Sequence, residues 1–130
     1  MNHEEALLKA FIDPNRTDRY MEFIATPKKR VKLIKELAHF KALNPRFMVP
    51  IPADQRNASA IMKLLKARGA GPMCWVISEN TKLDSHEMEL ETALKETVGY
   101  QMGTLISCVP GRLGYFEDEE VRCILERPRS

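Results

Sequence analysis

The sequence contains no run of about 18 consecutive apolar residues, which is the length a helix needs to cross a membrane. It also lacks the polar excess of disordered chains, because 44% of its 130 residues are hydrophobic and 29% are charged. The chain opens with His3, Glu4 and Glu5, so no cationic and apolar secretory signal is visible. These absences predict a soluble cytoplasmic protein without a membrane partner.

Cysteine pairs are missing as well. The three cysteines lie far apart in the sequence, and each is surrounded by apolar residues, as reduced core thiols are. They are Cys74, Cys108 and Cys123. Without two ligands at close spacing, neither a metal site nor another cofactor is expected.

Repeats, low-complexity segments and long linkers are absent, so residues 1–130 are expected to form a single domain. Three helices are predicted in residues 1–44. The first follows the capping pair Asn2 and Glu5, the second covers residues 17–25, and the third begins at Pro27 and ends before Asn44. The expected apolar stripe of the third helix is Val31, Ile34, Leu37, Ala38 and Leu43.

Residues 45–130 alternate between strand and helix patterns. Strands are predicted at 46–51, 73–78, 104–109, 113–117 and 121–126, and helices at 57–68 and 89–98. Pro50 in the first strand and Pro52 just after it place this strand at a sheet edge. The run MCWVIS at 73–78 is the candidate for the centre, enclosed by helices. Helical crossovers between strands favour parallel pairing, whereas the short connections of the last three strands favour an antiparallel meander. Together these patterns predict an α+β fold with a mixed five-stranded sheet.

Charge is unevenly distributed along the chain. Residues 1–70 contain 14 Lys or Arg and 7 acids, whereas residues 71–130 contain 6 Lys or Arg and 11 acids. Such an imbalance has two explanations: a basic surface for an acidic partner, or two halves that dock with complementary fields. The modest size of the imbalance favours the second.

The predicted third helix carries the first candidate site. Six cationic or titratable side chains follow its start along the sequence: Lys28, Lys29, Arg30, Lys32, Lys35 and His39. Cations at a helix N-terminus are locally unfavourable, but they are what an anionic small molecule or an acidic protein would bind. The alternative is a solvated basic face. Nucleic acid is disfavoured, because only Phe40 offers an aromatic ring there and the net charge is +2.

A second candidate site follows the MCWVIS strand. Polar groups at the end of a buried strand often line a ligand crevice, so Glu79 and His86 are the candidate catalytic acid and base. The alternative is an ordinary polar loop. No motif identifies a known family. The leading hypothesis is therefore a noncatalytic module, a monomer or a homodimer, that binds an acidic protein or another anion through the third helix. The rival is a small enzyme acting on a phosphorylated or carboxylated metabolite.

Overall fold

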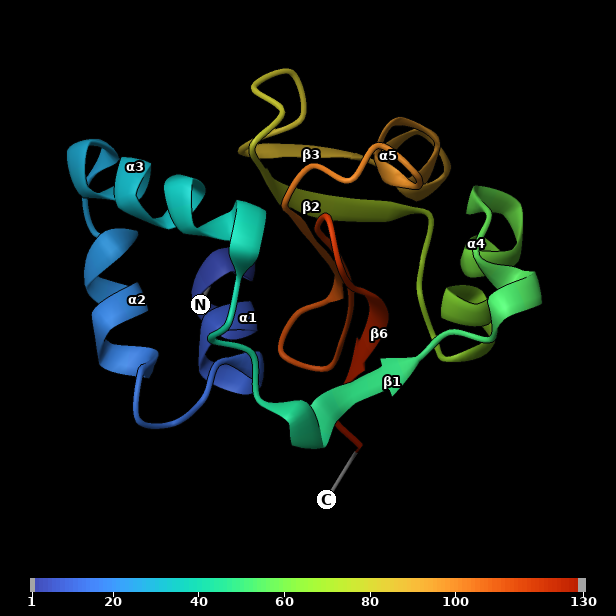
Figure 1. The fold of residues 1–130 in the computed structure, drawn as a ribbon, viewed down its shortest axis with the longest axis horizontal. Helices are drawn as coiled ribbons and strands as arrows, with labels where there is room; N and C mark the ends of the chain where they lie inside the picture. The colour runs from blue at the N-terminus through green and yellow to red at the C-terminus, as the bar shows by residue number, and fades with distance from the viewer. Residues whose placement is uncertain (1, 129–130) are drawn as a thin grey trace.

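The computed structural model describes residues 2–128, in which an antiparallel sheet of six strands lies between two groups of helices (Figure 1). The strands are β1 (Met48–Pro50), β2 (Met73–Ser78), β3 (His86–Glu89), β4 (Thr104–Val109), β5 (Leu113–Glu117) and β6 (Arg122–Glu126). The helices are α1 (His3–Phe11), α2 (Thr17–Phe23), α3 (Pro27–Glu36), α4 (Ala58–Ala67) and α5 (Leu90–Thr97). The predicted α+β class and C-terminal meander are confirmed.

The sheet differs from the prediction in strand number and direction. Its order is β1-β6-β5-β4-β2-β3, with six strands in place of five, and every pair is antiparallel, so the predicted mixed pairing is wrong. The cause is β3, which sequence analysis missed. Because β3 reverses the chain after β2, helix α5 connects β3 to β4, and β2 lies between these two strands. Helix α4 likewise connects β1 to β2, which are separated by β6, β5 and β4. Both expected crossovers therefore exist, but each joins strands that are not neighbours.

Side chains alternate between the two faces of the sheet and build a core on each. On one face Ile77, Leu105 and Phe116 pack with α1, α2 and α3, and on the other Val76, Ile106 and Tyr115 pack with α4 and α5. Figure 1 shows α2 and α3 on one side of the strands and α4 and α5 on the opposite side. Burial of apolar surface on both faces is the main stabilisation expected for such a layered arrangement.

Helix starts agree with the predicted capping residues. The Asn2 side chain accepts a hydrogen bond from the N–H of Glu5, and Asn57 caps α4 through the N–H of Ala60. The Thr26 side chain accepts from the N–H of Lys29, with Pro27 at the first helical position. Each cap satisfies an N–H group that the helix leaves free.

The predicted apolar stripe of α3 is wrong in part. Val31 is 52% exposed, whereas Leu33 is fully buried against the sheet, and α3 ends at Glu36 before a short 3-10 turn at Leu37–His39. Residues 31, 34 and 38 lie along one row of a helix, and residues 30, 33 and 37 lie along the adjacent row. Periodicity alone therefore does not decide which row is buried. Leu37 belongs to the predicted stripe and is buried as expected, whereas Leu33 was not predicted. Arg30 lies in the same row as Leu33, and its side chain is only 15% exposed and takes part in ion pairs.

The predicted sheet centre also needs correction. Strand β2 has its predicted bounds but lies next to the edge strand β3, while β4 and β5 are more central. The prediction that helices enclose β2 holds for Cys74, Val76 and Ile77, but Met73 is 42% exposed and Trp75 is only partly buried. The first strand is at the opposite edge, as its prolines predicted.

Ion pairs connect the basic and acidic halves of the chain. In the part of the chain that the structure describes, three pairs do so: Arg30 with Asp84, Lys41 with Glu120, and Arg68 with Glu126. His39 lies 3.7 Å from Glu119 and joins them when its imidazole is protonated. Part of the charge imbalance is therefore balanced within the molecule, although exposed pairs of this kind contribute little stability individually. In residues 2–128 no helix has the length and apolar character that crossing a bilayer requires.

We predict that the cysteines are unreactive in the folded protein. Burial raises the thiol pKa to about 12 for each of Cys74, Cys108 and Cys123. Since the thiolate is the reactive form, alkylation by iodoacetamide near pH 8 should be at least tenfold slower in the folded protein than in concentrated guanidinium chloride. Mass spectrometry of the labelled peptides measures each site, and rapid labelling of any one would contradict its burial.

Candidate functional site

The start of α3 is less available to a ligand than the sequence suggests. Arg30 donates to Glu4 at 2.7 Å and to both oxygens of Asp84 at 3.0 and 3.1 Å, and Lys29 is paired with Glu22 at 2.9 Å. The hydrogen bond and the charge of Lys29 lower the pKa of the Glu22 carboxyl. Lys28 is exposed, and Lys32 lies 6.0 Å from the Phe23 ring centre. Arg30 is a structural ion-pair residue, and the first turn offers only part of the predicted cluster.

A basic hollow lies at the other end of the α2–α3 hairpin. This cavity of about 260 Å³, which we call the basic hollow, is lined by five basic side chains. They are Arg16, Arg19, Lys35, His39 and Lys41. The structure thus places two of the six predicted residues, Lys35 and His39, with three others that sequence analysis did not select. The missed residues come from α2 and from the segment after α3, and no sequence spacing indicates that they meet.

Glu36 supplies the carboxylate of the basic hollow, and it is already engaged. It accepts 2.8 Å and 2.5 Å hydrogen bonds from Arg19 and from the Tyr20 hydroxyl. Burial raises the pKa of Tyr20 to about 12, and the Glu36 hydrogen bond adds to the rise, so this hydroxyl remains a donor. Among residues 2–128, Arg16 and Lys35 have no ion-pair partner. These two exposed cations are therefore available to an external anion.

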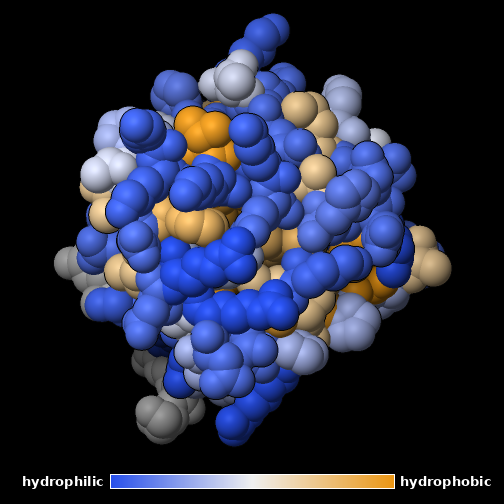
Figure 2. All heavy atoms as spheres, turned by 60° about the vertical axis from the view of Figure 1, so that its left-hand side comes forward, coloured by the Kyte–Doolittle hydropathy of each residue, from blue (hydrophilic) through white to orange (hydrophobic). Residues whose placement is uncertain are grey.

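The surface around the basic hollow is predominantly polar. Figure 2 brings the α2 and α3 side of the molecule forward and shows mostly hydrophilic side chains with small hydrophobic areas between them. Segment 16–41 contains eight Lys or Arg and three acids, which gives this side a positive excess. Such a surface suits a charged partner better than an apolar one.

Glu79 and His86 lie on opposite sides of β2. The Glu79 carboxylate accepts a hydrogen bond from the N–H of Gly103 at 2.6 Å, and the backbone N–H of Glu79 donates to the Gly103 carbonyl. Glu79 therefore holds in place the residue that precedes β4. His86 begins β3 on the other side, is exposed, and pairs in register with Val76. The geometry gives Glu79 a structural role and provides no support for acid and base catalysis by this pair.

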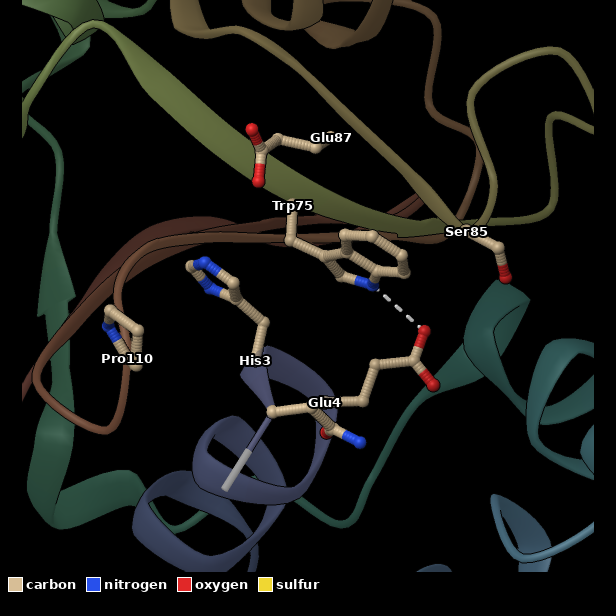
Figure 3. Close-up of a pocket in the computed structure, with 7 residues that line it drawn as sticks. His3, Glu4, Trp75, Ser85, Glu87 and Pro110 are labelled. Carbon is tan, nitrogen blue, oxygen red and sulfur yellow. Dashed lines mark hydrogen bonds between the residues drawn. The ribbon is translucent and has the colours of Figure 1, made fainter.

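A second cavity, of about 550 Å³, lies beside the only tryptophan, and we call it the Trp75 pocket. Its walls come from the first turn of α1, from β2 and β3, and from the β4–β5 turn (Figure 3). The lining residues are Asn2, His3, Glu4, Trp75, Ser85, Glu87 and Pro110. Sequence analysis missed this pocket, because His3 and Glu4 are about 70 residues from Trp75 and only tertiary packing brings them together.

Hydrogen bonds fix the walls of the Trp75 pocket. The indole N–H of Trp75 donates to Glu4 Oε2 at 2.8 Å, as Figure 3 shows, and His3 Nδ1 lies 2.8 Å from Ser107 Oγ. The imidazole and indole planes are nearly parallel, at 11°, with ring centres 6.4 Å apart. Arg30 donates to the same Glu4 oxygen at 2.7 Å. The pocket is therefore preorganised by residues from α1, α3 and the sheet.

Ser107 itself is not placed for nucleophilic chemistry. Its side chain is 2% exposed, and its hydroxyl is used by His3. A nucleophile must reach its substrate, so this His and Ser contact serves packing between α1 and β4.

Within residues 2–128, no group of three or more His, Cys, Asp or Glu side chains is arranged to hold a metal ion. Comparison with known proteins adds no family to these observations. No family model matches the sequence, no curated protein matches it, and no solved structure matches the fold significantly.

Proposed function

We propose that this chain is a noncatalytic binding module of the cytosol, acting as a monomer or homodimer, whose basic hollow binds an acidic segment of a partner protein. The observation that carries the proposal is the convergence of Arg16, Arg19 and Lys35, with His39 and Lys41, on one hollow. Among residues 2–128, Glu36 is the sole acid in its lining, and Arg16 and Lys35 have no ion-pair partner.

An acidic protein segment suits this surface because a carboxylate can bind Arg16 and Lys35 without displacing an existing ion pair. Tyr20 and Phe40 form the hydrophobic part of the lining, with ring centres 5.4 Å apart. The two residues are only 3% and 5% exposed, so the charged side chains supply most of the surface that a partner could contact.

Binding of a fluorescein-labelled polyglutamate peptide, followed by anisotropy, tests the proposal. The double variant Arg16→Gln, Lys35→Gln should weaken binding about five- to tenfold at low ionic strength, because two exposed charges are lost. Affinity of the unmodified protein should fall as salt is added.

The matched control is Lys63→Gln, Lys66→Gln, which removes two exposed charges from α4 on the opposite face of the sheet. It should change the affinity less than about twofold. Equal losses in the two double variants would mean that net charge alone drives binding, and the basic hollow would lose its assigned role.

A further inference from the structure

The Trp75 pocket has the dimensions of a ligand site. Cavities that hold small molecules commonly measure about 300–1,000 Å³ and combine apolar surface with a few fixed polar groups. The Trp75 pocket measures about 550 Å³ and offers the indole ring and Pro110 beside carboxylate, hydroxyl and amide groups. Its size and composition therefore fit a small organic molecule.

The charge of the lining favours a positively charged ligand. Two carboxylates, Glu4 and Glu87, line the pocket, and among the described residues neither a Lys nor an Arg does. Arg30 lies outside the lining but is bound to Glu4, so the charge of that carboxylate is balanced within the protein. Glu87 is exposed, and its carboxylate has no hydrogen bond or ion pair to any residue in the 2–128 range. An anion would be repelled here, and a cation would find a free counter-charge.

The register of the sheet puts the free carboxylate beside the indole. Glu87 on β3 is directly opposite Trp75 on β2, so both side chains project from the same face of the sheet. Figure 3 shows Glu87 on one side of Trp75, with His3 and Glu4 on the other. Tryptophan is the strongest aromatic partner for a cation, and the bond to Glu4 keeps the ring in one orientation.

We propose that the Trp75 pocket binds a small organic amine, whose ammonium group pairs with Glu87 and whose apolar body lies against Trp75 and Pro110. This site is separate from the basic hollow and does not depend on the function proposed there. Both the indole orientation and the cross-strand position of Glu87 are set before a ligand arrives, which lowers the ordering cost of binding.

The single tryptophan makes the test direct. Phenethylamine is the probe, and its neutral and anionic analogues are phenethyl alcohol and 3-phenylpropionate. Titration with phenethylamine should change Trp75 fluorescence and shift its indole N–H peak in a nitrogen-proton NMR spectrum, with saturation at a Kd of about 1 mM or below. The two analogues should bind at least about tenfold more weakly, because they cannot form the charge-assisted bond.

Glu87→Gln should weaken phenethylamine binding about tenfold, whereas Glu96→Gln, which removes an exposed charge from α5, should leave it unchanged. Absence of saturation, equal affinity for the alcohol, or unchanged binding by Glu87→Gln would each overturn the proposal. The comparison of the three ligands needs no variant, so the outcome does not rest on how Glu87→Gln folds.

Discussion

Replacing Gly103 with alanine should destabilise the protein by about 3 kcal/mol or prevent folding. A Cβ at this position would overlap the carbonyl group of Leu37 and would lie 2.6 Å from the Leu37 side chain. Leu37 is fully buried between α3 and the sheet, so neither backbone has room to move away. Overpacking a rigid core costs about 1–3 kcal/mol or more, and overlap with backbone atoms belongs at the upper end.

Urea unfolding measures this effect, with Gly71→Ala as the matched control. A Cβ at Gly71 would meet no atom within 4 Å, and the backbone φ of Gly71 lies outside the left-handed region. The free energy of unfolding of Gly71→Ala should therefore differ from that of the unmodified protein by no more than about 0.5 kcal/mol. If Gly103→Ala unfolded at the same urea concentration as the unmodified protein, the close approach of the β4 entry to Leu37 would be wrong.

Replacing Glu117 with alanine should lower the free energy of unfolding by about 3–5 kcal/mol. The side chain is completely buried, and its two oxygens accept from the N–H groups of Gly99 and Gln101 and from the Tyr115 hydroxyl. Arg122 Nε lies 3.5 Å away. Burial, followed by the Glu117 charge, raises the pKa of Tyr115 far above its usual range, so this hydroxyl stays protonated and remains a donor. Alanine would leave several buried donors without an acceptor.

Hydrogen exchange distinguishes this role from general destabilisation. In Glu117→Ala the amides of Gly99 and Gln101 should lose their protection before the β4 and β5 amides do, because the carboxylate is their acceptor. Glu96→Ala on the exposed surface of α5 should change the unfolding free energy by less than about 0.5 kcal/mol. Unchanged exchange at the two amides would contradict the assignment of Glu117 as the anchor of the α5–β4 loop.

Sequence patterns predicted those elements whose local signals agree with their tertiary environment. The cap at Asn2, the run Met73–Ser78 and the three C-terminal strands all combine such a signal with burial on the expected side. Strand β3 gave no such signal, because HEME is polar and contains no β-branched residue. Its conformation is set by pairing with β2, which is an interaction between distant segments.

The candidate sites were harder to predict for the same reason. Lys35 and His39 were selected from helical spacing, but Arg16 and Arg19 join them only because α2 folds back beside α3. Lys41 joins them from the segment after α3. Arg30 was expected at the surface because it is charged, yet partners from α1 and the β2–β3 turn hold it partly buried. Sequence spacing describes one helix at a time and carries no information about which helices become neighbours.

The position of α1 has a consequence for the order of events during synthesis. Ala10 accepts a hydrogen bond from Arg127, and the core around Leu8 and Phe11 is completed by Phe116 and Leu125. Phe116 and Leu125 are made after α1, so until then the helix can pack only against earlier segments such as α2 and α3, and part of its apolar side stays uncovered. Full docking of α1 therefore depends on contacts between segments distant in sequence, which form slowly in folding.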